Sequence, residues 1–281
     1  MRANLCKTIS TLMTAVAPAI VSGCVPSDWG ASALLRPARR AVSVAPALPH
    51  QEISFATNAG IIHGWLFRTT ESRRGLIVYL HGVGDNRQSG NGLALRFVPK
   101  GFDVLAYDSR AHGISQGQYC TYGFYEKHDV SLALDAVGAR SAILFGSSMG
   151  AAIAIQAASV DHRVSAVVAQ SPFSDLPTII RERAPFFLTR RTVAEAIASA
   201  ELLARFSVTD VSPLRAATNV QIPVLLVHGE LDREIAPAHS ERIYQQLAGR
   251  KKLMIVPGAS HNDVLARDEV WRAIEDFVNG Y

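Results

Sequence analysis

The stretch that decides the fold is residues 142–155, AILFGSSMGAAIAI. Four apolar residues stop at a glycine, and two serines, a methionine and a second glycine follow before a run of small and aliphatic residues. The first run has the length and character of a buried strand, whereas the alanine-rich second run is typical of a helix. The stretch therefore predicts a sharp strand–turn–helix junction with two serines in the turn.

The turn itself, Gly146-Ser147-Ser148-Met149-Gly150, has the form G-x-S-x-G of a nucleophile elbow. This motif requires a strand before it and a helix after it, which is the predicted context. Glycine suits both outer positions because side chains there would collide with each other or with the neighbouring strand. The frame selects Ser148 as the candidate nucleophile. A glycine-rich turn without chemistry is the alternative interpretation.

A serine hydroxyl is a weak nucleophile unless a base takes its proton, and the base needs an acid to hold its tautomer. Candidates follow two later predicted strands. Asp232 ends the segment HGELD after one strand, and His261 ends the segment GASH after the next. The chain thus supplies a serine, an acid and a histidine in that order, with Glu230 as the runner-up acid.

Predicted strands and helices alternate between residues 51 and 281. Such alternation with apolar strands indicates a mostly parallel sheet covered by helices on both faces. The segment 176–213 interrupts the alternation and is helical in character, so we expect it to form a small cap inserted over the strand ends. With 281 residues, 48% of them hydrophobic, the chain is long enough to bury one core of this kind.

The N-terminal residues have a different pattern. Arg2 and Lys7 precede a short apolar run, and small residues follow it, which predicts a secretory signal peptide over residues 1–23. The sequence VSGC at 21–24 resembles the bacterial lipoprotein box, in which the chain is cut before a cysteine that is then lipidated. We therefore expect a lipidated Cys24, a linker over 24–50 and anchoring to a membrane of the bacterial cell envelope. An ordinary cleaved signal with a chance cysteine is the alternative.

Residues 51–281 resemble an α/β-hydrolase, particularly the small single-domain serine hydrolases related to prolyl oligopeptidases and bacterial esterases. The resemblance rests on the HGELD and GASH segments and on three further ones: NAGIIHGWL at 58–66, HGVG at 81–84 and DSRAHGIS at 108–115. It implies an α/β-hydrolase fold with a mostly parallel eight-stranded sheet and a small helical cap. Ala111 stands where glycine is usual in the family, which affects a structural turn and not the chemistry.

The same resemblance assigns roles to individual residues. It implies Ser148 as nucleophile, His261 as base and Asp232 as orienting acid. It also places the oxyanion between the backbone N–H groups of Met149 and Val83, with Gly84 as the alternative to Val83. The expected reaction is cleavage of a carboxylic ester through an acyl-serine intermediate. The expected partner is a small ester or acyl substrate.

Other classes of site find no support in the sequence. Without H-E-x-x-H, paired cysteines or a G-x-G-x-x-G after the first strands, neither a metal nor an organic cofactor is expected. A net charge of only +4, from scattered Lys and Arg, does not predict nucleic-acid binding. The arginines of the cap have two interpretations: they form a solvated face, or they attract an acidic substrate. The phenylalanines in and next to the cap also have two: they line an acyl pocket, or they pack the cap onto the sheet. These residues are Arg181, Arg183, Arg190, Arg191, Arg205, Phe173, Phe186 and Phe187.

Three alternative functions stay open at this point. The first keeps the triad but changes the bond, as in a peptidase, amidase, thioesterase or acyltransferase. The second is a non-catalytic binding lipoprotein on the same fold, because a fold alone does not establish activity. The third is a dehalogenase or epoxide hydrolase, which Ser148 disfavours because those relatives carry aspartate at the nucleophile position.

Overall fold

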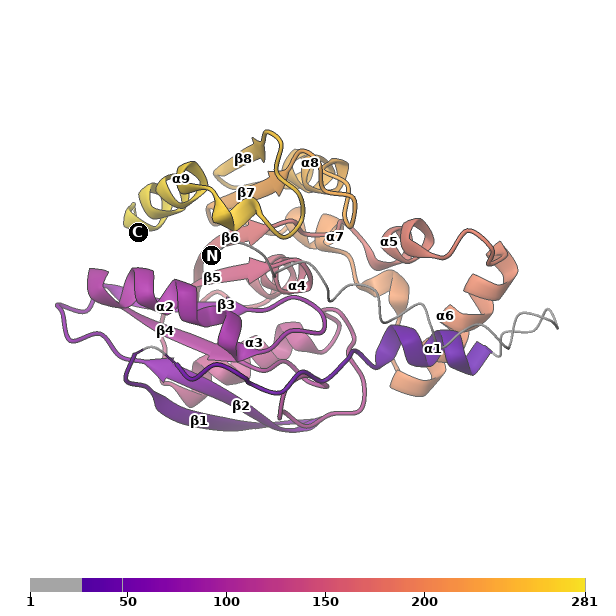
Figure 1. The fold of residues 1–281 in the computed structure, drawn as a ribbon, viewed down its shortest axis with the longest axis horizontal. Coiled ribbons are helices and arrows are strands. Elements are labelled where there is room, and N and C mark those ends of the chain that lie inside the picture. The colour runs from indigo at the N-terminus through magenta and orange to yellow at the C-terminus, as the bar shows by residue number, and fades with distance from the viewer. Residues whose placement is uncertain (1–26, 47, 281) are drawn as a thin grey trace, which may run out of the picture.

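The computed structural model describes residues 27–46 and 48–280. Their centre is an eight-stranded sheet in the order β1-β2-β4-β3-β5-β6-β7-β8 (Figure 1). The strands are β1 (Gln51–Thr57), β2 (Gly60–Phe67), β3 (Gly75–Leu80), β4 (Phe102–Tyr107), β5 (Ala142–Ser147), β6 (Val164–Gln170), β7 (Val224–Gly229) and β8 (Lys251–Val256).

Only the pairings of β2, with β1 and with β4, are antiparallel, and the other neighbours in the sheet are parallel. The interior strands β4 and β7 are buried along their whole length. Strands covered on both faces carry continuous apolar runs, which is why their positions can be predicted from hydrophobicity. The predicted mostly parallel, eight-stranded α/β sheet is confirmed.

Helices cover both faces of this sheet. Side chains of α3, α4, α7 and α8 complete one apolar core, and those of α2 and α9 complete the other. In α9, for example, Val270, Ile274 and Val278 recur at four-residue spacing and are all buried, as an amphipathic helix requires. The helices are α1 (Ser27–Leu35), α2 (Asn91–Phe97), α3 (Glu126–Ala136), α4 (Met149–Ala158), α5 (Leu176–Arg183), α6 (Arg190–Ala204), α7 (Pro213–Ala217), α8 (Ala238–Gln246) and α9 (Asp268–Asn279).

The segment predicted as a cap holds α5 and α6, and both begin at side-chain caps. The Asp175 carboxylate accepts a hydrogen bond from the Thr178 amide at 2.9 Å, and the Thr189 hydroxyl accepts one from the Thr192 amide at 3.1 Å. Such caps satisfy amides that have no partner within the helix. The Thr189 cap also fixes the end of the six-residue connection between the two helices.

Helix α1 lies along α6 and completes a third apolar cluster with the cap (Figure 1). Ala31 and Leu35 are fully buried in it. The contact is close, because a Cβ added to Gly30 would lie 2.7 Å from the Cβ of Ala196. The linker predicted over 24–50 is thus wrong for residues 27–35. A helix this short is stabilised mainly by packing, so its sequence gives little sign of it.

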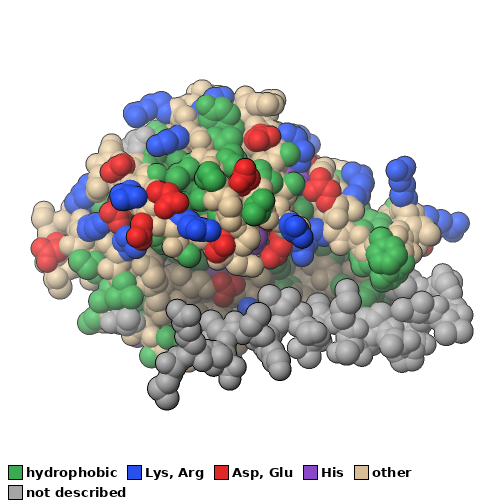
Figure 2. Space-filling model, turned by 45° about the horizontal axis from the view of Figure 1, so that its top comes forward, with side chains coloured by type: hydrophobic (Ala, Val, Ile, Leu, Met, Phe, Trp, Pro, Cys, Tyr) green, Lys and Arg blue, Asp and Glu red, His purple; other side chains and the backbone are tan. Residues whose placement is uncertain are grey.

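The remaining N-terminal predictions concern other residues. The predicted signal peptide and Cys24 lie outside the described part of the chain. Within residues 27–46 and 48–280, no helix has the length and apolar content needed to cross a membrane. On the face shown in Figure 2, Lys and Arg side chains are interspersed with Asp and Glu over most of the surface.

Candidate active site

The serine elbow joins β5 to α4 at the carboxyl edge of the sheet. Ser148 has φ +54° and ψ −115°, a conformation that costs a non-glycine residue about 1–3 kcal/mol. Its amide donates a hydrogen bond to the Gln170 carbonyl at 2.8 Å, which fixes the turn against β6. Side chains on either flank are excluded. A Cβ at Gly146 would overlap the Gly150 carbonyl, and one at Gly150 would overlap the Leu80 carbonyl.

The predicted base and acid are in direct contact. Nδ1 of His261 lies 2.6 Å from Oδ2 of Asp232. Because a carboxylate only accepts hydrogen bonds, Nδ1 carries the proton, and Nε2 is left with a lone pair. The His261 side chain is 10% exposed and that of Asp232 is fully buried. The histidine is therefore held in the tautomer that can accept a proton at Nε2.

The Asp232 carboxylate is also fixed by the loop that follows it. Its Oδ1 accepts hydrogen bonds from the amides of Glu234 and Ile235, both at 2.9 Å. Burial alone raises the pKa of Asp232. The hydrogen bonds from His228, His261 and the Ile235 amide outweigh burial and hold this pKa well below its ordinary value. The carboxylate is consequently ionised at neutral pH.

A second histidine, His228, braces this acid and was not among the predicted site residues. It is fully buried, with Nδ1 2.7 Å from the Ser240 hydroxyl and Nε2 2.8 Å from the Ile235 carbonyl. Since a carbonyl only accepts, Nε2 carries the proton, which it shares with Asp232 Oδ2 at 3.2 Å. A lone histidine at the end of a strand carries no sequence signal for such a role.

Ser148 and His261 open into the same cavity of about 400 Å³, which Val83 and Met149 also line. Met149 is the first residue of α4, so its amide has no partner within that helix. Among the described residues, neither the Met149 nor the Val83 amide donates a hydrogen bond. Two free backbone donors thus border the cavity at the end where the serine lies.

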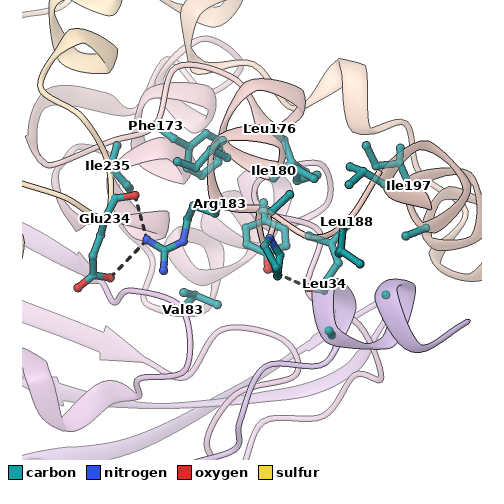
Figure 3. A pocket seen from close by; sticks show the side chains of 18 of the residues that line it. Leu34, Val83, Phe173, Leu176, Ile180, Arg183, Leu188, Ile197, Glu234 and Ile235 are labelled. Carbon is teal, nitrogen blue, oxygen red and sulfur yellow. Dashed lines mark hydrogen bonds and ion pairs between the residues drawn. The ribbon is translucent and has the colours of Figure 1, made fainter. Parts of the chain in front are cut away.

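The rest of this cavity is built mainly by α1, α5 and α6, and nearly all its lining side chains are apolar (Figure 3). Of the predicted phenylalanines, Phe173 lines it, whereas Phe186 and Phe187 are exposed outside it. Of the cap arginines only Arg183 lines it. The other lining residues are Trp29, Gly30, Ala33, Leu34, Tyr122, Leu176, Ile179, Ile180, Ala184, Pro185, Leu188, Thr192, Val193, Ala196, Ile197, Glu234 and Ile235.

Other candidate residues have structural partners. The runner-up acid Glu230 accepts a hydrogen bond from the Gly258 amide at 2.9 Å and so ties together the two loops that carry the acid and the base. His81 braces its own loop, because Nδ1 lies 2.7 Å from the Gly82 carbonyl and Nε2 accepts from the Ser109 amide at 3.0 Å. Among the described residues, no three His, Cys, Asp or Glu side chains are grouped to hold a metal ion.

Comparison with known proteins agrees with this fold. The family model described as the alpha/beta hydrolase fold matches residues 75–201. This match covers less than half of the chain and, together with the sheet topology, shows an α/β-hydrolase fold. Among solved structures, an esterase of Pyrococcus furiosus matches this chain with a TM-score of 0.70 at 19% identity, covering 88% of this chain and 99% of the esterase. At that identity the likeness is one of fold.

Two sequence relatives are uncharacterised proteins. One, from Bacillus subtilis, is 33% identical over 195 residues, which are 66% of this chain and 64% of that protein. The match therefore spans less than two thirds of the Bacillus protein. The other, from Mycobacterium tuberculosis, is 27% identical over 265 residues, covering 89% of this chain and 88% of that protein.

Proposed function

We propose that this α/β-hydrolase is a serine hydrolase that cleaves carboxylic esters through an acyl-serine intermediate. One observation carries the proposal. The histidine that an ionised Asp232 holds at 2.6 Å shares a cavity with Ser148, whose backbone adopts the strained elbow conformation. Binding a ligand requires neither the strain nor the fixed tautomer, so both favour catalysis. The esterase of similar fold adds an analogy.

In the first half of the proposed reaction, Oγ of Ser148 attacks the ester carbonyl carbon while its proton passes to Nε2 of His261. Asp232 stabilises the imidazolium that forms. The Met149 and Val83 amides donate hydrogen bonds to the oxyanion, and the N-terminus of α4 adds partial positive charge. The tetrahedral intermediate then collapses, its C–O bond to the alcohol breaks, and the alcohol leaves with the proton from His261.

In the second half, water replaces the alcohol. His261 takes a proton from the water while the water oxygen attacks the acyl carbon. The same two amides hold the new oxyanion. Collapse breaks the bond between the acyl carbon and Ser148 Oγ, which regains its proton from His261. The products are a carboxylic acid and the free enzyme, so atoms and charge balance without a cofactor.

The apolar cavity favours an ester with a hydrocarbon acyl group over a peptide. A buried peptide segment would need hydrogen-bond partners for each amide, and leaving them unpaired is costly. The lining from α1, α5 and α6 offers few such partners. A hydrocarbon chain needs none.

A substrate panel tests the proposal. Nitrophenyl esters, acyl thioesters and aminoacyl anilides are compared for Ser148→Ala and for the neighbouring Ser147→Ala as a matched control. We expect ester turnover that Ser148→Ala lowers by about 10⁶-fold, the effect of removing a catalytic serine, while Ser147→Ala retains turnover. Preference for the anilides would identify a peptidase, and undiminished turnover by Ser148→Ala would exclude the acyl-serine mechanism.

We also propose that the exported protein is held at a membrane of the bacterial cell envelope by a lipid on Cys24. Support comes from the sequence alone, where VSGC ends a signal-like segment. Metabolic labelling with an alkynyl fatty acid tests this. Cys24→Ala should lose the label and leave the membrane fraction, whereas Cys6→Ala should keep both. Labelled Cys24→Ala would exclude this anchor.

A further inference from the structure

The cavity that serves the proposed hydrolase contains one cationic side chain whose charge is permanent. Arg183, in the last turn of α5, lines it together with a mostly apolar set of neighbours. The other ionisable side chains in the lining are Glu234, the catalytic His261 and the Tyr122 phenol, whose hydroxyl donates to the Leu34 carbonyl at 2.8 Å.

The contacts of Arg183 use only part of its donor set. Nη1 donates to the Glu234 carbonyl at 2.9 Å, and the same atom lies 3.8 Å from the Glu234 carboxylate, beyond hydrogen-bond distance. A guanidinium has five N–H donors in a planar fork. In the described structure Nε and Nη2 make no hydrogen bond, and the side chain is about half exposed. Arg183 can therefore bind a further acceptor.

The position of this guanidinium divides the cavity into two ends. Figure 3 shows Arg183 beside Glu234 and above Val83, whose amide borders the catalytic end. In Figure 3 the aliphatic side chains of Leu188 and Ile197 lie on the opposite side of Arg183 from Glu234, toward α1 and α6. A substrate with its carbonyl at Ser148 would place a hydrocarbon chain in the aliphatic end. Its alcohol would then lie toward Arg183.

We propose that the substrate is an amphiphilic acyl ester whose alcohol carries an anionic group, either a phosphate or a carboxylate, and that Arg183 is the specificity residue that binds this group. The inference rests on the proposed serine hydrolase function and names its substrate class. Both anions match a guanidinium fork, which binds them through two parallel hydrogen bonds. The bond cleaved and the proton path are those given above.

Glu234 offers a second test of the inference, because its carboxylate would compete with an anionic substrate for the Arg183 guanidinium. Its carboxylate is also bound by Asn262, whose Nδ2 donates to Oε1 at 3.1 Å. An incoming anion would take the Arg183 donors and lie close to the Glu234 charge, which repels it. Removing that charge should therefore strengthen binding of an anionic substrate, the opposite of the effect expected at Arg183.

The competing interpretation is structural. Arg183 joins α5 to the loop after Asp232, so its loss could disturb the catalytic acid for every substrate. This role predicts equal losses on neutral and anionic esters, whereas anion recognition predicts a loss confined mainly to the anionic ones. The ratio of kcat/KM between two matched substrates separates the two roles.

The experiment compares decanoyl glycerol with decanoyl glycerol phosphate and decanoyl glycerate, all with one acyl chain, in the full-length protein. We expect the wild type to prefer at least one anionic ester. Arg183→Met should lower the anionic-to-neutral ratio by about tenfold, the lower end for a hydrogen bond to a charged group, because the site is half exposed. Arg183→Lys should fall between, and Glu234→Gln should raise the ratio. Arg181→Met removes the same charge from α5 outside the cavity and should leave the ratio unchanged.

Each outcome decides one of the two proposals. A wild-type ratio near one, equal losses on all three esters, or an unchanged ratio in Arg183→Met would overturn anion recognition. Ser148-dependent cleavage of decanoyl glycerol would leave the hydrolase proposal standing in each of these cases. No cleavage of any of the three esters would overturn the substrate class, and turnover of nitrophenyl esters would then decide the hydrolase proposal separately. If Arg183→Met does not fold, the opposite shifts expected for Arg183→Lys and Glu234→Gln decide the question.

Discussion

The serine elbow and the cap differ in what fixes them. Ser148, Asp232 and His261 follow the parallel strands β5, β7 and β8, and each is held by short hydrogen bonds to neighbouring strands or loops. The cap holds its cavity by apolar packing of α5 and α6 against α1, a helix from the other end of the sequence. Among the described residues, one charged contact, between Arg183 and Glu234, joins the cavity lining of the cap to the loop that carries Asp232.

This difference indicates that the residues proposed to react and the residues proposed to select the substrate lie in different regions. In the proposed hydrolase, hydrogen bonds on rigid strands hold the reacting groups to the narrow tolerance that proton transfer needs. Apolar helix packing tolerates changes of shape, so the cavity can change its substrate while the triad stays intact. Substitutions near the elbow should therefore alter rate or pH response, and substitutions in the cap should alter selectivity.

The largest effect is expected from a substitution in the rigid region around Ser148, Asp232 and His261. Asp232→Asn would present an amide to His261 Nδ1, favour the tautomer with its proton on Nε2 and leave that nitrogen unable to take the Ser148 proton. We expect kcat to fall by about 10⁴-fold, measured on a nitrophenyl ester. Glu230→Gln, two residues earlier, is the control and should keep most activity. A larger loss for Glu230→Gln would show that the acid is misassigned.

The second prediction concerns pH and the loop behind the elbow. Burial lowers the pKa of His112 from 6.5 to about 4, and the His81 ring, 4.9 Å away, adds to the shift. Between these values the unfolded chain binds a proton that the folded chain does not, so stability falls as pH falls from about 6.5 to 4. This histidine accounts for about 3 kcal/mol of that loss.

His112→Asn should remove much of this dependence, because an asparagine amide can replace the Nδ1 donor that now meets the Arg110 carbonyl at 2.9 Å. Urea unfolding at several pH values measures it. His162→Asn, at an exposed position, is the control and should leave the slope unchanged. An unaltered slope in His112→Asn would mean that another group titrates in this window.

The third prediction breaks the packing that builds the cap. Gly30→Ala adds a Cβ 2.7 Å from that of Ala196, and such overpacking costs about 1–3 kcal/mol. Gly92→Ala, the same change in α2, meets nothing within 4 Å and should stabilise by about 0.5–1 kcal/mol. Thermal unfolding compares the two. Equal effects of the same sign would contradict the close contact between α1 and α6.

The fourth prediction has the smallest expected effect and tests whether the cap cavity selects the acyl chain. Ile197→Trp fills the aliphatic end of the cavity and should lower kcat/KM for a decanoyl ester about tenfold relative to an acetyl ester. Leu202→Trp, on the exposed side of α6, should change neither. Equal losses on both esters would mean that the acyl chain lies elsewhere.

These two regions also differ in how far the sequence predicts them. The elbow was predictable because its two glycines, its serine and its strand–helix context are all consecutive. Asp232 and His261 were predictable as strand-end residues, and the apolar strands gave the sheet. In each case the physical cause is local: a close backbone approach, a strand period or a chain order.

The cavity could not be predicted from local sequence patterns. Trp29 and Leu34 lie far from α5 and α6 in the sequence, and their local sequence pattern does not predict that they contact these helices. Arg183 was one of five cap arginines with no feature to distinguish it. His228 acts through Ser240 and Ile235, partners that only the tertiary structure brings together. The positions that set specificity depend on long-range packing, which leaves weak local signals.

The most direct test of the central claim is mass spectrometry of the purified protein after reaction with a fluorophosphonate, which labels activated serines. The account predicts a single adduct on Ser148, and none when His261 is replaced by alanine in a protein that still folds. No adduct on the folded wild type, or an adduct that persists in His261→Ala, would contradict a serine activated by the Asp232–His261 pair.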